Sequence, residues 1–165
     1  MKFCSVCIIV LAAASVAGET RPLFVIERSL NRNVLHYEAN LEPNGLLDPK
    51  GPVVAFWVMV ENGGMREDLT FLENAKAYGF KAERAADGKG FHLRLKAIEN
   101  RPVVVRQEGE AVWAETAIGG RLCTLERIFI TSEGKKLIPK VLSIDLYGTD
   151  RKTGEPCRET IPGEQ

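Results

Sequence analysis

The chain has 165 residues, of which 45% are hydrophobic and 27% are charged, with 22 basic and 22 acidic residues. This balance lacks the excess of positive charge with which proteins bind nucleic acid or an anionic membrane surface. The length and the hydrophobic content predict one globular domain with a substantial core.

The first element is an export signal. Residues 3–17 carry no charged side chain, follow Lys2 and end in small residues, which is the pattern of a cleaved signal peptide. The run is shorter than the roughly 20 apolar residues that a membrane-spanning helix needs. We therefore predict a signal peptide over residues 1–18 and a single mainly β domain over residues 19–165. This domain is expected to be soluble, without a stable membrane span, in the periplasm or the extracellular medium.

The cysteines divide at the cleavage site. Removal of the signal takes away Cys4 and Cys7 and leaves Cys123 and Cys157. An even pair in an exported protein predicts a disulfide. The alternative is a small buried residue at Cys123 and an incidental thiol at Cys157, because pairing requires Cα atoms closer than about 7 Å.

Most of the mature chain has the pattern of short strands separated by turns. In residues 33–41, Leu35, Tyr37 and Ala39 alternate with polar or smaller side chains, which predicts one dry face and one wet face. The predicted strands are nine in number and cover residues 23–28, 33–41, 53–60, 80–86, 91–97, 103–107, 111–118, 122–131 and 141–147.

The third strand and the segment after it differ from the rest. Residues 53–60 are hydrophobic on both faces, which predicts a central strand covered on both sides. Thr70 and Glu73 then have capping-box spacing, an apolar stripe begins at Phe71, and Gly79 can end a helix. We predict one short helix after the third strand, with a loop containing one irregular turn as the alternative.

Nine strands in sequence order predict a mainly β fold, an antiparallel meander that closes as a barrel or a strongly curled sheet. The alternative is a two-sheet β-sandwich. Periodicity does not separate the two, since both require the same alternation along each strand.

Residues 26–41, 54–81 and 144–154 resemble a family of exported bacterial proteins known as a domain of unknown function. The resemblance covers most of the mature chain and implies export and a shared fold, with no activity to carry over. Its most particular motifs are Glu27-Arg28-Ser29, Trp57, Arg66-Glu67, Tyr78-Gly79-Phe80-Lys81 and Asp145-Leu146-Tyr147-Gly148.

Catalytic and metal-binding patterns are weak. Ser29, His36 and Asp145 could be nominated as a triad, but no Gly-x-Ser-x-Gly motif surrounds any serine. His36 and His92 occupy strand positions that we expect to face solvent rather than a metal. We predict no catalytic residue, no metal ligand and no cofactor. A hydrolase that uses a histidine or a carboxylate in a cleft is kept as the less favoured alternative.

Charged residues inside apolar strands are more informative. Arg127 shares one face of its predicted strand with Leu125, whereas Glu126 shares the other face with Ile128. Burial of either face would therefore bring a charge inside, and a buried charge is costly unless it is paired. The simpler interpretation is an internal ion pair. The sharper hypothesis is a concave site for a polar or anionic ligand. Its candidate residues are Arg28, Trp57, Tyr78, Arg127 and Tyr147.

We therefore predict an exported, non-catalytic module that binds a small polar or amphipathic ligand. The alternative is a protein-interaction module of the cell envelope, which would expose an apolar patch of several hundred Å². The expected partner is accordingly an unidentified small molecule or an envelope protein, and not nucleic acid.

Overall fold

The computed structural model describes residues 18–134 and 139–163. The predicted signal peptide lies outside the described residues, apart from Gly18. Strands make up 63% of the structure. In chain order they are β1 (Glu19–Arg28), β2 (Asn31–Leu41), β3 (Val53–Met59), β4 (Met65–Asp68), β5 (Phe80–Arg84), β6 (Gly90–Leu95), β7 (Val103–Glu108), β8 (Ala111–Ile118), β9 (Arg121–Glu133), β10 (Lys140–Asp150) and β11 (Pro156–Pro162).

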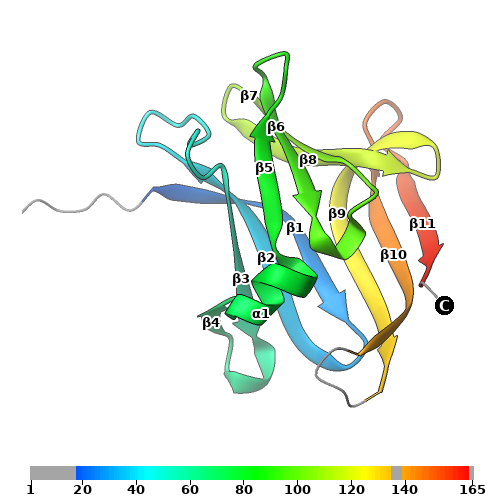
Figure 1. Cartoon of the computed structure of the whole chain (residues 1–165). Coiled ribbons are helices and arrows are strands. Elements are labelled where there is room, and N and C mark those ends of the chain that lie inside the picture. Colours follow the sequence, from blue (N-terminus) through cyan, green and yellow to red (C-terminus); the bar gives the residue numbers. More distant parts are fainter. Residues whose placement is uncertain (1–17, 135–138, 164–165) are drawn as a thin grey trace, which may run out of the picture.

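Nine of these strands form one sheet in the order β4-β3-β2-β1-β9-β8-β7-β6-β5 (Figure 1). The sheet curls through 238° and forms a half-barrel. The mainly β fold and the strongly curled sheet are therefore confirmed. β10 and β11 continue the structure from β9, since β10 pairs with β9 and β11 pairs with β10.

The sheet departs from a pure meander at β1. This strand lies parallel to β9, with Ile26 opposite Ile128, so the sheet is mixed. β10 pairs with β9 along most of its length. β8 and β1 therefore share the other edge of β9. β8 pairs with residues 121–124 of β9, and β1 pairs with residues 127–130.

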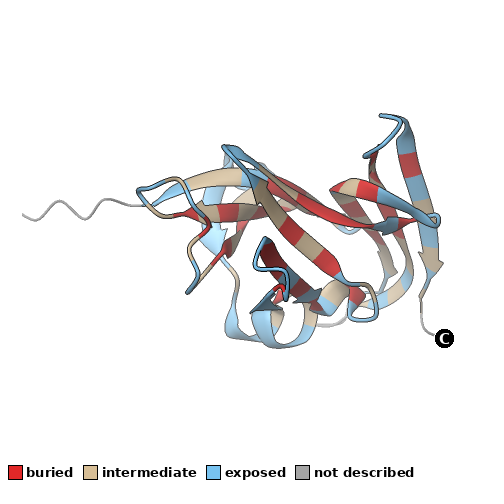
Figure 2. Ribbon diagram, turned by 90° about the horizontal axis from the view of Figure 1, so that it is seen from above, coloured by how far each residue is buried: buried red, intermediate tan, exposed pale blue. Residues whose placement is uncertain are grey.

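The core lies on the inner, concave face of the half-barrel. In β2 the side chains of Leu35, Tyr37 and Ala39 are fully buried and their neighbours in sequence are not. Buried positions recur in this way along several strands (Figure 2). The predicted alternation is confirmed, and each fully buried large apolar side chain contributes about 1.5 to 3 kcal/mol relative to an exposed one.

A β-bulge resolves the conflict between the charges of β9 and its apolar positions. Tyr147 of β10 lies opposite Arg127, but the next residue of β10, Gly148, lies opposite Leu125, so Glu126 is left unpaired. The extra residue shifts the alternation by one. Leu125 and the residue after Arg127 are both buried, while Glu126 is exposed and Arg127 is half-buried. Neither charge enters the core.

β3 carries apolar residues on both faces, as predicted, but it is not central. It lies between β2 and the short edge strand β4, all of whose residues are exposed. On the outer face Phe56 is nonetheless buried, because the Arg66 guanidinium lies 3.6 Å from its ring centroid and the His36 ring stacks on it at 5.6 Å. A cation and an imidazole cover the second face of this strand.

The predicted helix is present, after β4 rather than directly after the third strand. It comprises α1 (Phe71–Glu73) and a π-helical turn, η2 (Asn74–Tyr78), and the capping box of Thr70 and Glu73 is formed. The predicted apolar stripe is wrong at its first residue, since Phe71 is 88% exposed. This α1–η2 segment joins β4 to β5, the two ends of the nine-stranded path, and so crosses the open side of the half-barrel.

The predicted disulfide between Cys123 and Cys157 is confirmed, with Cα atoms 6.7 Å apart. Cys123 lies on β9 and Cys157 on β11, on either side of β10. Two strands separated by a third are roughly 10 Å apart in a flat sheet. The shorter distance therefore requires the sheet to fold sharply at β10.

An ion pair ties β11 to the loops at its side. The two guanidinium Nη atoms of Arg101 donate to the two carboxylate oxygens of Glu159 at 2.9 and 2.5 Å, and the Gly119 backbone N–H donates to the same carboxylate at 2.8 Å. These bonds favour the ionised form, so the pKa of Glu159 is lowered, most by Arg101 and next by Gly119.

The substitution Glu159→Gln is expected to lower the free energy of unfolding by about 2 kcal/mol at neutral pH. A carboxyl whose pKa is lower in the folded state stabilises fully above its unfolded pKa, about 4.3 for glutamate. That contribution is lost as the pH falls through the folded pKa. The difference between wild type and variant should therefore be constant above about pH 5 and shrink on acidification below about pH 4.

Urea unfolding followed by circular dichroism over a pH series measures this difference. The matched control is Glu155→Gln, because the Glu155 side chain is 68% exposed and its carboxylate makes only long contacts, with Arg121 and with the Thr153 hydroxyl, both at 3.4 Å. We expect its effect to stay below about 0.5 kcal/mol. An equal loss in both variants would show that the paired geometry of Glu159 is not the source of the stabilisation.

Candidate functional site

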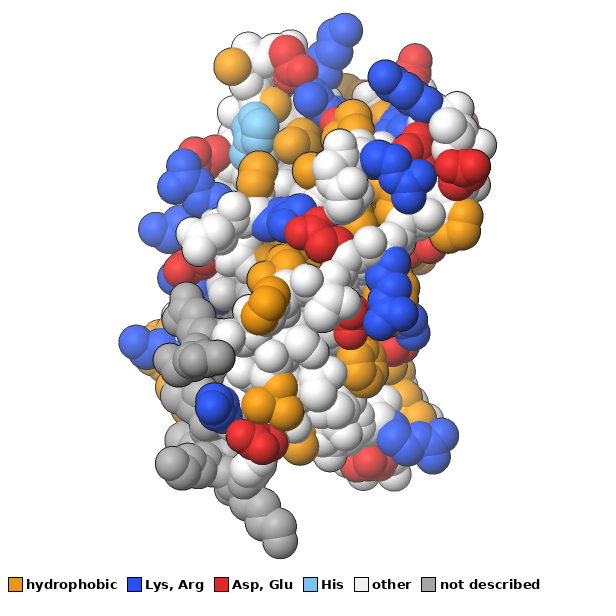
Figure 3. Space-filling model, turned by 90° about the vertical axis from the view of Figure 1, so that its right-hand side faces the viewer, with side chains coloured by type: hydrophobic (Ala, Val, Ile, Leu, Met, Phe, Trp, Pro, Cys, Tyr) orange, Lys and Arg blue, Asp and Glu red, His pale blue; other side chains and the backbone are white. Residues whose placement is uncertain are grey.

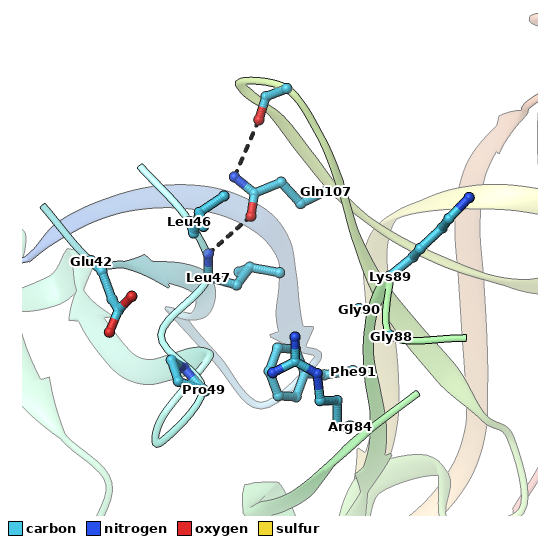
Figure 4. A pocket seen from close by; sticks show the side chains of 11 residues that line it. Glu42, Leu46, Leu47, Pro49, Arg84, Gly88, Lys89, Gly90, Phe91 and Gln107 are labelled. Atoms are coloured by element: carbon cyan, nitrogen blue, oxygen red, sulfur yellow. Dashed lines mark hydrogen bonds between the residues drawn. The ribbon is translucent and has the colours of Figure 1, made fainter. Parts of the chain in front are cut away.

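Two of the cavities formed by the described residues lie at opposite ends of the half-barrel. We call them upper and lower after the position in Figure 1 of the strands, loops and helical turns that line them. The upper cavity has a volume of about 450 Å³ and lies between the β2–β3 loop, the β5–β6 turn and β7. In the close view, Leu47 and Pro49 lie across it from Phe91 and Arg84 (Figure 4). The lower cavity has a volume of about 570 Å³.

Gln107, one of the polar residues that line the upper cavity, already has its hydrogen bonds. The side-chain oxygen of Gln107 accepts from the Leu47 backbone N–H at 2.9 Å (Figure 4). Its amide nitrogen donates to the carbonyl oxygens of Gly45 and Gly109 at 2.6 and 3.2 Å. Gln107 therefore acts as a brace between two loops, and its hydrogen-bonding groups are not free to recognise a ligand.

The lower cavity lies where the inner face meets the α1–η2 segment. β1, β9 and β10 provide one wall, and α1, η2 and the 3₁₀ turn η3 (Lys96–Ile98) provide the other. Half of its lining is apolar, namely Leu30, Leu72, Ala77, Ala97, Ile130, Pro139, Val141 and Ile144. The remainder is polar, namely Arg28, Asn31, Thr70, Glu73, Lys76, Tyr78, Lys96 and Ser132.

Three of the predicted site residues meet at this cavity. The guanidinium carbon of Arg28 lies 4.2 Å from the centroid of the Trp57 ring and 5.5 Å from that of Tyr78. The two rings are edge to face, 5.4 Å apart. Arg28 and Tyr78 line the cavity, and Trp57, only 3% exposed, supports Arg28 from the core.

The Arg28 guanidinium is only partly satisfied. It donates to the Tyr78 hydroxyl oxygen at 3.3 Å and to the Asn31 side-chain oxygen at 3.2 Å. Within residues 18–134 and 139–163, Arg28 forms no ion pair, and the buried side-chain polar atoms without a partner are Arg28 Nε and Trp57 Nε1. Both orphaned atoms are donors and belong to this one cluster. Buried donors of this kind call for an explanation, because nearly all others are paired.

Tyr78 is held in place through its backbone. The hydroxyl of Tyr37 donates to the Tyr78 carbonyl oxygen at 2.5 Å, and the backbone N–H of Lys96 donates to the carbonyl of Gly79 at 2.9 Å. Burial raises the pKa of Tyr37 far above its usual range, so it remains a neutral donor. Gly79 is required by space, since a Cβ there would lie 1.9 Å from the Asn74 carbonyl oxygen.

The other two predicted site residues, Arg127 and Tyr147, lie together on the outer face. The guanidinium carbon of Arg127 is 4.1 Å from the Tyr147 ring centroid, and Arg127 pairs with Glu27 at 3.2 Å. On the side of the molecule that carries β10 and β11, basic and acidic side chains are interspersed with hydrophobic ones (Figure 3). We interpret Arg127 and Tyr147 as a surface stack with its charge already paired.

The residues nominated for catalysis do not converge. The Ser29 hydroxyl donates to the Ser132 carbonyl oxygen at 3.2 Å, and His36 stacks on Phe56 on the outer face. Asp145 accepts hydrogen bonds from Thr160 and, at 3.3 Å, from Arg158, which lower its pKa, Thr160 having the larger effect. Neither the upper nor the lower cavity is lined by His36 or His92.

One group in the described part of the chain has the spacing of metal ligands, formed by Cys123, Asp150 and Cys157. Both sulfur atoms are bonded to each other in the disulfide. They are therefore not thiolates, which are the form that binds metal. Asp150 instead caps the turn after β10, where it accepts from the backbone N–H groups of Lys152 and Thr153 at 2.8 and 3.1 Å.

Sequence reasoning missed most of the lower cavity. Asn31 lies between the predicted strands of residues 23–28 and 33–41, and Ile130 and Ile144 are apolar strand positions like many others. Their association follows from strand pairing, since Arg28 lies opposite Ile130 and Ile130 lies opposite Ile144. Lys76 could have been found, because it lies close to Tyr78 on the predicted helix.

Comparison with known proteins gives the family but no activity. No helix in the described ranges is long and apolar enough to cross a membrane. No curated protein and no solved structure matches this chain. Residues 24–160 match the family described as a domain of unknown function, DUF4833, in agreement with the resemblance seen in the motifs. Since this match spans most of the chain, the protein belongs to the DUF4833 family.

Proposed function

We propose that this protein is an exported, non-catalytic module, formed by residues 19–165, that binds a small amphipathic ligand in the lower cavity. The carrying observation is the cavity of about 570 Å³, whose lining combines apolar strand residues with the polar side chains of Arg28, Tyr78 and Lys76. Its volume falls within the range of about 300 to 1,000 Å³ that is usual for small-molecule sites. The export signal in the sequence and the Cys123–Cys157 disulfide support an oxidising compartment.

The apolar wall favours a ligand with a hydrocarbon part. Ile130 and Ile144 come from neighbouring strands, and Leu72 and Ala77 face them from the α1–η2 segment. Leu72 is 38% exposed and Leu30 is 47% exposed at the rim, so apolar surface continues from the cavity to the outside. Burial of a ligand's alkyl chain contributes about 0.8 kcal/mol per methylene group.

Filling the cavity is expected to abolish binding. Ala97 is half-buried and lines the lower cavity, so Ala97→Phe would place a ring where the ligand lies. We expect the affinity for decanoate, measured by isothermal titration calorimetry of the purified protein, to fall at least about tenfold, the loss of roughly two buried methylene groups.

The matched control is Ala86→Phe, since Ala86 is exposed in the turn after β5 and lines neither cavity. It should bind decanoate as the wild type does. Wild-type affinity in Ala97→Phe would show that the ligand does not occupy the lower cavity. A wild-type protein that binds none of decanoate, decyl phosphate and decanol would overturn the proposed function.

A further inference from the structure

The strongest unexplained feature of the molecule is the positive charge held inside the lower cavity. Arg28 has five N–H groups, and two of them are used, by Tyr78 and Asn31. No carboxylate of the described residues lies within 4.0 Å of its guanidinium. A partly buried charge without a counter-charge is unfavourable, and an incoming anion removes that cost.

The acidic residue of the cavity does not supply the missing charge. The carboxylate of Glu73 accepts from the backbone N–H and the hydroxyl of Thr70 at 2.9 and 2.8 Å, so it is committed to capping α1. Lys96 pairs with Glu99 outside the cavity. Lys76 forms no ion pair within residues 18–134 and 139–163. The cavity therefore has two cations, Arg28 and Lys76, that form no ion pair with any carboxylate in the described part of the chain.

Trp57 and Tyr78 orient the guanidinium. The Trp57 ring lies against its face, which attracts the cation and restricts its rotation. A stacked arginine presents its N–H groups in one plane, and this fork matches the two oxygens of a carboxylate or phosphate. The arrangement is thus already organised for an oxyanion before any ligand arrives.

The strand register places an apolar track beside this charge. Arg28 of β1, Ile130 of β9 and Ile144 of β10 lie opposite one another across three adjacent strands. Neighbouring strands are about 4.8 Å apart, so the row extends roughly 10 Å from the guanidinium. A medium-length alkyl chain that begins at Arg28 would lie along Ile130 and Ile144.

We propose that the ligand of the lower cavity is an amphipathic oxyanion, whose carboxylate or phosphate head is bound by Arg28 and whose hydrocarbon tail lies on Ile130 and Ile144. This inference rests on the proposed function and defines the ligand class. Lys76 is the second cation within reach of the cavity, and it adds attraction for the head without the fork geometry of Arg28.

The first test compares three probes with the same tail on the wild-type protein by isothermal titration calorimetry. Decanoate and decyl phosphate carry the anionic head, and decanol does not. We expect at least one anion to bind about tenfold to a hundredfold more tightly than decanol, the effect of hydrogen bonds to a charged group. The tighter of the two anions identifies the head as carboxylate or phosphate.

The second test removes the guanidinium. Arg28→Gln should remove most of the difference in affinity between the preferred anion and decanol, with Lys76 retaining the rest, and should leave decanol binding within about twofold, since the apolar track is retained. Arg28→Lys should recover part of the preference. The matched control is Arg32→Gln, an exposed arginine of the same β1–β2 hairpin that does not line the cavity. It should keep the full preference for the anion.

The outcomes separate this inference from the function on which it rests. Equal binding of decanol and both anions to the wild type would overturn the anion inference and leave the amphipathic-ligand function standing. Absence of binding by all three probes would overturn both. The wild-type comparison requires no variant, so it remains decisive even if Arg28→Gln does not fold. An unchanged anion preference in a folded Arg28→Gln protein would also contradict the inference.

Discussion

Replacing both Cys123 and Cys157 with alanine is expected to lower the free energy of unfolding by about 3 to 4 kcal/mol. The two residues are separated by 34 positions, and a cross-link over a loop of this length reduces the entropy of the unfolded chain by about that amount. The bond also holds β11, which pairs only with β10 among the described strands. Its loss should therefore free the C-terminal strand first.

Guanidinium chloride unfolding under oxidising conditions, followed by circular dichroism, measures this loss. Wild-type protein treated with a reductant provides the matched comparison and should unfold at the midpoint of the double variant. Thiol titration of protein recovered from its host tests whether the bond is present in the cell. Equal midpoints for oxidised wild type and double variant would show that the cross-link does not stabilise the fold.

Trp57→Ala is expected to destabilise the protein by about 3 to 5 kcal/mol, the range for truncation of a buried aromatic side chain. Trp57 is 3% exposed and lies opposite the fully buried Leu35 of β2. Its removal leaves a cavity in the core and also removes the ring against which the Arg28 guanidinium lies. Ligand affinity should therefore fall together with stability, since the guanidinium loses its orientation.

Trp113→Ala is the matched control. Trp113 is half-buried on β8, where its Nε1 donates to Glu115 at 3.0 Å and Arg151 lies 4.1 Å from its ring. We expect a loss of about 1 kcal/mol, typical of a substitution outside the core, and unchanged ligand affinity. Chemical unfolding and calorimetric titration of both variants test this difference. Similar losses of stability in the two would contradict the central position assigned to Trp57.

Trp57→Phe separates the two roles of this side chain. Phenylalanine keeps an aromatic face for the Arg28 guanidinium but is smaller and lacks Nε1. We expect Trp57→Phe to lose less stability than Trp57→Ala, and its ligand affinity to lie closer to that of the wild type. If ligand affinity and stability fall in strict proportion across the variants, Trp57 stabilises the fold and has no separate role in orienting Arg28.

Local patterns predicted most of the elements, because each has a short-range physical cause. The alternation of Leu35, Tyr37 and Ala39 is a property of any strand with one buried face, and it appears as predicted in β2. The capping box of Thr70 and Glu73 depends only on residues three positions apart, and it is formed.

The elements that were missed lack such local causes. β4 (Met65–Asp68) is exposed at every residue, and β11 (Pro156–Pro162) begins and ends with proline, so neither shows an alternating apolar pattern. Their pairing is set by neighbours, β3 for the first and β10 for the second. The bulge at Glu126 likewise could not be inferred from its own strand, because it is defined by the register with β10.

The candidate site shows the same division. Arg28, Trp57 and Tyr78 were selected from the sequence as a group with Arg127 and Tyr147, yet the two sets lie on opposite faces of the sheet. Adjacent strand residues point to opposite faces. Arg28 therefore faces the core while Glu27 meets Arg127 outside. The choice of face depends on the register of β1 against β9, which no single strand encodes.

The sequence by itself determined the strand-rich class, the helix cap, the cysteine pair available for a disulfide and the residue types suited to binding an oxyanion. These depend on composition and on interactions between residues close in the chain. Only the tertiary structure decided that β1 pairs in parallel with β9, and that an unpaired arginine and an apolar track therefore share one cavity. Such associations join residues about a hundred positions apart, and their energy arises only when the whole sheet curls around its core.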